Sequence, residues 1–87
     1  MRKYSIRISQ SAEKSLKTIP KNDQKRIAHA IITLANNPFP VGARKLSGLD
    51  DTYRIRVRHY RMIYSVDQRI VTIIILKIGH RKEVYRH

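Results

Sequence analysis

The sequence contains no cysteine, and only three glycines and three prolines occur among its 87 residues. Without cysteine, neither a disulfide nor a thiolate-bound metal can hold the fold together, and nothing indicates an oxidising compartment. Long hydrophobic runs are also missing. The longest run, Ile70–Leu76, is far shorter than the roughly 20 residues that a membrane span requires. The basic N-terminus lacks the apolar segment of a secretion signal. We therefore expect a cytoplasmic protein without a membrane contact and, at this length, a single domain over 1–87.

Acidic residues are scarce, since six Asp and Glu stand against nineteen Lys and Arg, a formal net charge of +13. Such an excess is typical of proteins that contact phosphate backbones, and the same field would attract an acidic protein partner. Solubility alone is the simpler interpretation, but the charge is organised. Residues 51–87 contain seven arginines, several at alternate positions. The planar guanidinium group matches phosphate geometry better than an ammonium group does, so the pattern favours a polyanionic ligand.

The arginines alternate with apolar residues over 53–58, which predicts a strand with one apolar and one cationic face. Two more strands are expected, at 61–66 after a connection at His59 and Tyr60, and at 70–78, where an almost continuous β-branched run predicts a central strand ended by Gly79. Burying the guanidinium groups without partners under helices would cost several kcal/mol each. The arginines are therefore expected on the open face of the sheet: Arg54, Arg56, Arg58 and Arg61.

Clustered cations on neighbouring strands repel one another unless an anion lies between them, so a bound polyanion explains the cluster better than stability does. A merely solvated strand face is the alternative interpretation. Near the C-terminus, Tyr85 is either a packing residue or an aromatic ring on which a single-stranded base stacks. The four histidines are too scattered to form a metal site, and no phosphate loop or catalytic triad is visible, so no metal or cofactor is expected.

The first half of the chain is expected to form the scaffold that supports the arginine strands. An alternating strand over 3–8 directs Tyr4, Ile6 and Ile8 inward, and Ser9 caps a helix over 10–18 that stops at Pro20. A second helix, capped by Asn22 or Asp23, continues to about Asn36, and residues 43–52 form a loop. The predicted class is α+β in the order β-α-α-β-β-β, with a helical hairpin packed on one face of a largely antiparallel four-stranded sheet and a short C-terminal helical tail.

Four segments in this order resemble the RelE/ParE toxins of bacterial toxin–antitoxin systems: Lys45-Leu-Ser-Gly-Leu, Tyr53-Arg-Ile-Arg-Val-Arg, Tyr60-Arg-Met-Ile-Tyr and Ile78-Gly-His-Arg-Lys-Glu-Val-Tyr. The resemblance covers nearly the whole chain. RelE-like members cleave messenger RNA in the ribosomal A site, whereas ParE-like members inhibit DNA gyrase and lack the basic catalytic set. Because that set is present here, the resemblance implies a metal-independent endoribonuclease. Gyrase inhibition and a general basic RNA-binding module are the alternatives.

The resemblance also implies the roles of individual residues. By position, it makes five of them catalytic: Arg54, Arg56, Arg61, Arg81 and Tyr85. Three more are expected to contact the substrate: Lys45, Arg58 and His80. Many members carry lysines where this chain has Arg54 and Arg56, and arginine does not readily give up a proton. The general base is therefore His80 or His59, or else the enzyme relies on positioning alone.

Partners follow from the same resemblance. It implies an acidic RelB-like antitoxin that wraps the toxin in a hetero-oligomer and covers the arginine face, which fits the charge of +13. It further implies that the ribosome, with its RNA, presents the messenger RNA to the toxin.

Overall fold

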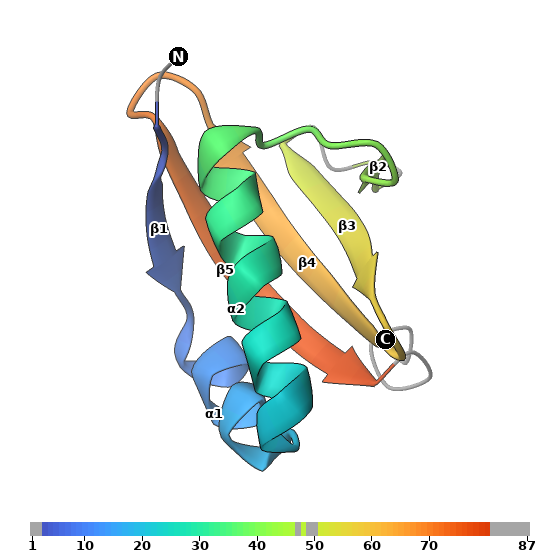
Figure 1. Ribbon diagram of the computed structural model, residues 1–87. Helices are drawn as coiled ribbons and strands as arrows, with labels where there is room; N and C mark the ends of the chain where they lie inside the picture. The colour runs from blue at the N-terminus through green and yellow to red at the C-terminus, as the bar shows by residue number, and fades with distance from the viewer. Residues whose placement is uncertain (1–2, 47, 49–50, 81–87) are drawn as a thin grey trace.

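The computed structural model describes residues 3–46, 48 and 51–80. The elements follow one another as β1 (Ser5–Ile8), α1 (Gln10–Thr18), α2 (Lys21–Asn36), β2 (Arg44–Lys45), β3 (Thr52–Val57), β4 (Tyr60–Asp67) and β5 (Thr72–His80). One mixed sheet has the strand order β1-β5-β4-β3-β2, in which β1 is parallel to β5 and every other neighbour is antiparallel. Helix α2 crosses one face of the sheet, and α1 packs at one end of β5 (Figure 1). The predicted α+β class is confirmed.

The core lies between α2 and the sheet, because the spacing of apolar residues gives the helix and the strands one apolar side each. Helix α2 contributes a buried stripe at helical spacing: Ile27, Ile31, Leu34 and Ala35. Alternate residues of β4 meet it, namely Met62, Tyr64 and Val66. Tyr64 is fully buried, and its hydroxyl donates a 2.8 Å hydrogen bond to the Pro38 carbonyl oxygen. Burial, with a smaller contribution from Tyr53, raises the pKa of Tyr64 to about 12.

A bulge interrupts the pairing of β4 with β5. Ile63 pairs with Lys77 and Tyr64 with Ile75, so Leu76 has no opposite residue on β4. The extra residue reverses the alternation, which is why Ile75 and Ile78, three positions apart, are both buried. The Ser9 hydroxyl connects this bulge to α1, because it donates to the Leu76 carbonyl oxygen at 2.8 Å and accepts from the Ala12 amide at 3.0 Å. The prediction that Ser9 caps α1 is thereby confirmed, and Ser9 also binds the bulge of β5.

Several predicted boundaries were wrong. The sheet has five strands rather than four, because two residues of the expected 43–52 loop pair with β3 to form β2. Strand β5 starts at Thr72 rather than Ile70, and Gly79 lies inside it. Ile8 was expected to point into the core but is 39% exposed, since it lies at the end of the short edge strand β1. The predicted C-terminal tail falls outside the described residues.

The starts of α2 and β4 also differ from the predictions. Helix α2 begins at Lys21, directly after Pro20, without a side-chain cap. Asp23 instead accepts a 3.2 Å hydrogen bond from the Tyr60 hydroxyl on β4. The β3–β4 turn consists of Arg58 and His59, whereas His59 and Tyr60 were expected, so Tyr60 is the first residue of β4. None of the described helices has the length and apolar character needed to cross a membrane.

Candidate active site

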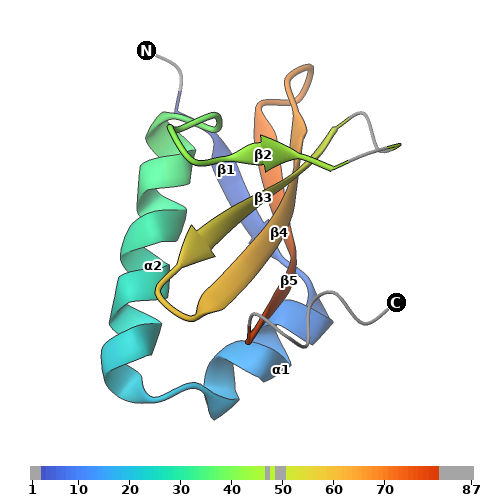
Figure 2. The same cartoon turned by 90° about the vertical axis from the view of Figure 1, so that its right-hand side faces the viewer.

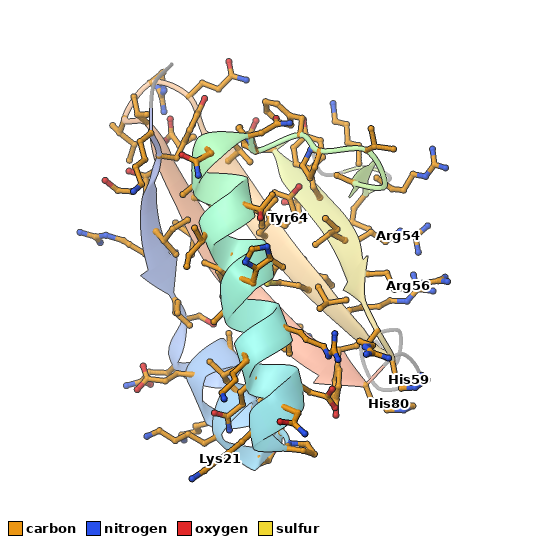
Figure 3. All side chains as sticks on the ribbon, in the orientation of Figure 1. Lys21, Arg54, Arg56, His59, Tyr64 and His80 are labelled. Atoms are coloured by element: carbon orange, nitrogen blue, oxygen red, sulfur yellow. The ribbon has the colours of Figure 1, made fainter. Side chains whose placement is uncertain are left out.

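The register of β2, β3 and β4 assembles arginines on the sheet face opposite α2. Arg56 on β3 pairs with Arg61 on β4, and Arg54 pairs with Arg44 on β2. Opposite residues of an antiparallel pair share one face of the sheet, so all four side chains start from the same face. Figure 3 shows Arg54 and Arg56 projecting from β3 away from α2. The predicted cationic face therefore exists, and Arg44 is a member that the sequence analysis missed.

These arginines line a hollow of about 300 Å³ together with Gly42. A turn forms one wall of the hollow, in which the Ala43 amide donates a 3.0 Å hydrogen bond to the Pro40 carbonyl oxygen. Gly42 in this turn has a φ of +100°, a backbone conformation that residues with a side chain rarely adopt. This turn leads the chain directly into β2 and so brings Arg44 beside Arg54. Pro40 and Gly42 are the residues from which this turn could have been predicted.

Arg61 is only 8% exposed, although an exposed position was expected for it. The expectation considered the face of one strand alone, and a strand's alternation does not show what covers that face. Arg56, in contrast, is exposed, and Arg54 is partly buried. The hollow therefore has a buried cation and an exposed one on directly opposite residues. In such a partly dehydrated place, cation–anion attraction is stronger than at an open surface.

The electrostatics of the hollow favour an anion. Each paired position places one arginine opposite another, and like charges directly opposite on a sheet destabilise it. None of the described lining residues is acidic. Guanidinium groups converging from three strands provide several N–H donors for the oxygens of a phosphate group. The arrangement therefore suits a phosphodiester better than it suits folding stability.

The three residues predicted to contact the substrate do not line the arginine hollow. Arg58 occupies the β3–β4 turn with a φ of 59°, outside the strand alternation, and so does not join the arginine face. Lys45 pairs with Tyr53, a residue that packs on the core, so the register directs Lys45 to the side opposite the hollow. His80 pairs with Tyr60 on that same core side. The roles of these three residues in substrate binding stay predictions.

His80 belongs to a small cluster with His59 and Tyr60. The cluster lies at the end of the sheet where the turn joins β3 to β4. The ring centroid of His80 is 6.5 Å from that of His59 and 6.1 Å from that of Tyr60, and Figure 3 shows the two histidines side by side. Desolvation, followed by the hydrogen bond and the charge of Asp23, raises the pKa of Tyr60 above its ordinary value. Neither histidine lines the arginine hollow.

Arg81 and Tyr85 lie outside the described residues, so their predicted roles stay predictions. Within residues 3–46, 48 and 51–80, no group of three or more His, Cys, Asp and Glu side chains is placed to hold a metal ion. Lys77 is a further cation that the sequence analysis missed. It pairs with Ile63, which stands opposite Arg54, so Lys77 starts from the arginine face. Its identification needed the bulge, which reverses the parity of β5 after Ile75.

Comparison with known proteins agrees with this fold. Residues 6–85 match the family model described as the ParE toxin of the type II toxin–antitoxin system, parDE. RelE1 of Methanocaldococcus jannaschii is 36% identical, with 98% of each chain covered, and toxin RelG of Mycobacterium tuberculosis is 30% identical over 95% of this chain and 97% of its own. In the crystal structure of the archaeal RelE–RelB complex from Pyrococcus horikoshii OT3, a chain that is 33% identical superimposes with a TM-score of 0.83, covering 95% of this chain and 99% of that one.

A helical hairpin on a mixed sheet is thus the architecture of a known class of small bacterial and archaeal toxins. The chain belongs to the RelE/ParE family of toxins from type II toxin–antitoxin systems. The predicted family is confirmed. The curated relatives are similar to this chain over nearly their entire length.

Proposed function

We propose that this toxin is a ribosome-dependent endoribonuclease that cleaves messenger RNA in the ribosomal A site and thereby inhibits translation. The observation that carries the proposal is the hollow of about 300 Å³ lined by Arg44, Arg54, Arg56 and Arg61. A phosphodiester is the anionic group that messenger RNA presents at every nucleotide. The hollow lies on the sheet face that α2 leaves open, so an extended RNA strand can approach it.

The reaction needs only the substrate's own nucleophile. The 2′-oxygen of the ribose attacks the adjacent phosphorus atom and loses its proton, the bond from phosphorus to the 5′-oxygen breaks, and that oxygen takes up a proton. The products are a 2′,3′-cyclic phosphate and a 5′-hydroxyl group. Negative charge on the phosphorane oxygens is highest in the transition state, where preorganised guanidinium donors stabilise it most. Arg61, the buried member of the hollow, is suited to this role, and Arg56 is suited to hold the phosphate in place.

The described lining of the hollow contains no group that readily accepts a proton near neutral pH. His59 and His80, the candidate bases, do not line the hollow: His59 lies in the β3–β4 turn, and His80 pairs with Tyr60 on the core side of the sheet. This arrangement favours a catalyst that relies on positioning and charge, with the ribosome holding the RNA in the reactive geometry. His80→Gln should then change single-turnover cleavage by no more than about threefold, far less than the loss expected of a general base.

The proposed partners follow from charge and from the relatives. A chain with a net charge of +13 attracts an acidic partner. The Pyrococcus horikoshii relative was solved as a complex of RelE with RelB. We propose a RelB-like acidic antitoxin in a toxin–antitoxin hetero-oligomer, and the ribosome with its messenger RNA as the target, all within the cytoplasm.

Primer extension on a reporter messenger after induction of the toxin tests the activity. Cuts should appear within the translated frame and should be absent when the reporter cannot be translated. Arg56→Ala and Arg61→Ala should reduce cutting by at least about 100-fold, because each removes a donor aimed at transition-state charge. Arg7→Ala is the matched control, since Arg7 is exposed on β1, remote from the hollow. Equal cutting by all four proteins would refute the assignment of the site.

The second candidate function is inhibition of DNA gyrase, which the ParE description of the matching family model favours. It predicts growth arrest without cuts in the reporter, together with loss of supercoiling by purified gyrase in the presence of the toxin. Arg56→Ala would then affect the gyrase assay rather than the messenger. The two functions are separated by measuring both readouts on the same preparation.

A further inference from the structure

A second concave surface lies on the other side of the sheet, between α2 and the turn that joins β3 to β4. It has a volume of about 420 Å³ and is lined by Lys25, Arg26 and His29 of α2 and by Val57 and Arg58 of the β3–β4 hairpin. We call it the hairpin groove. In Figure 2 the end of this hairpin reaches toward α2.

The chemistry of the hairpin groove is cationic at its sides and apolar at its base. Lys25, Arg26 and Arg58 are exposed, whereas Val57 is partly buried and packs against the core. No acidic residue is among the described lining residues, and within the described part of the chain these three cations form no ion pair with an acidic side chain. Their mutual repulsion is therefore uncompensated within this part of the fold.

The hairpin groove is separate from the arginine hollow. Val57 pairs with Tyr60, whose hydroxyl contacts α2, whereas the preceding residue, Arg56, starts from the opposite face of the sheet. Among the residues that the structure describes, the two sites share no lining residue. A ligand in the groove therefore leaves the hollow uncovered, and a long partner can occupy both by passing around the hairpin.

We propose that the hairpin groove docks an acidic, amphipathic segment of the antitoxin, as a second contact remote from the catalytic hollow; this rests on the toxin–antitoxin function proposed above. Carboxylates of such a segment meet Lys25, Arg26 and Arg58, and an apolar side chain between them covers Val57. An apolar base is what distinguishes this surface from a phosphate-binding one, since a nucleic-acid backbone offers no aliphatic group to bury there. Binding also removes the repulsion among the three cations.

Fluorescence anisotropy with the full-length toxin tests the proposal. The probe is a labelled 20-residue peptide, about the length of a long helix, with Glu at the polar and Leu at the apolar positions of a helical period. A scrambled peptide of the same composition and a single-stranded RNA of similar charge are measured beside it. Lys25→Asn combined with Arg26→Glu removes the charge that α2 contributes to the groove and leaves Arg58, a predicted substrate contact, unchanged. Lys14→Glu combined with Lys17→Asn on α1 makes the same change in net charge outside the groove.

The amphipathic peptide should bind the wild-type toxin and the α1 variant equally and the groove variant at least about tenfold more weakly, whereas Arg56→Ala should bind it as the wild type does. Circular dichroism checks that both double variants are folded. Equal weakening in the two double variants, or equal binding of the scrambled peptide, would show attraction by net charge alone and would overturn the proposal. A selective loss of RNA binding in the groove variant would assign the surface to nucleic acid instead. Messenger cleavage by the groove variant should persist, so a failure of the proposed nuclease function would appear in the primer-extension assay and not in this one.

Discussion

Arg56 and Arg61 stand directly opposite each other on β3 and β4, on the face of the sheet that α2 does not cover. Two cations in this relationship work against folding, because their side chains leave the sheet close together. Arg61 is at the same time one of the buried residues of the chain. An anion bound between the two guanidinium groups would offset this repulsion, so stability and anion binding should respond in opposite directions when Arg56 is changed.

Arg56→Gln should therefore stabilise the folded toxin while it impairs the site. We expect the free energy of unfolding to rise by about 0.5 kcal/mol at low ionic strength, and the gain to shrink in about 0.5 M salt, where charges are screened over a few ångströms. Urea unfolding at the two salt concentrations measures both effects. Arg7→Gln on β1, whose sheet partner is the uncharged Ile74, is the control and should give a smaller gain. A destabilised Arg56→Gln protein would contradict the interpretation of the pair as repulsive.

Inorganic phosphate should stabilise the toxin by binding in the hollow. A ligand at about 100 times its dissociation constant adds about 2.7 kcal/mol to the free energy of unfolding, and the melting temperature rises accordingly. Arg61→Ala and Arg44→Ala should abolish most of this rise, because both residues line the hollow, whereas Lys14→Ala on α1 should retain it. Thermal unfolding in phosphate and in chloride of equal ionic strength provides the measurement. The same rise in wild type and Arg61→Ala would place the anion elsewhere.

The sequence predicted the layers of the fold well, because periodicity reports which side of an element is buried. The second helix and the strand at 61–66 were both predicted, and they appear in the structure as α2 and β4, each with a buried apolar side. The run from 70 to 78 could not be assigned so exactly, since nearly every residue in it is apolar. A bulge at Leu76 therefore changes which residues face the core without leaving any mark in the pattern.

The candidate site could be predicted only in part, because periodicity shows which side of a strand a residue occupies but not how strands pair. Arg54, Arg56 and Arg61 follow from alternation on two strands, and the structure brings them together. Arg58 was misplaced because alternation cannot show where a strand stops and a turn begins. Arg44 was missed because β2 has only two residues, too few for a period, and its place depends on pairing with β3. Contacts that arise from tertiary pairing are beyond the reach of a single sequence.

The buried Tyr64 should make the fold sensitive to high pH. Its pKa is about 12 in the folded chain against an ordinary value of 10.0, so the folded state holds this proton more tightly than the unfolded state does. The stabilisation, about 3 kcal/mol for a shift of this size, is complete below the unfolded pKa and is lost as the pH rises through the folded one. Tyr64→Phe should remove this pH dependence and, by losing the hydrogen bond to Pro38, cost about 1 kcal/mol at neutral pH. Urea unfolding of both proteins over this pH range measures the difference, and parallel curves would contradict the assignment.

The Ser9 hydroxyl should be worth more than an ordinary helix cap, because it serves the start of α1 and the bulge of β5 together. Ser9→Ala removes the acceptor for the Ala12 amide and the donor to the Leu76 carbonyl oxygen, so we expect a loss of about 2 kcal/mol in the free energy of unfolding. Ser9→Thr keeps a hydroxyl and should recover most of it. Ser11→Ala, at an exposed position of α1, should change stability by less than about 0.5 kcal/mol. Chemical unfolding of the three variants separates the cases: equal stability of Ser9→Ala and Ser11→Ala would mean that the bulge carbonyl is satisfied without Ser9, and that α1 and β5 are joined by apolar packing alone.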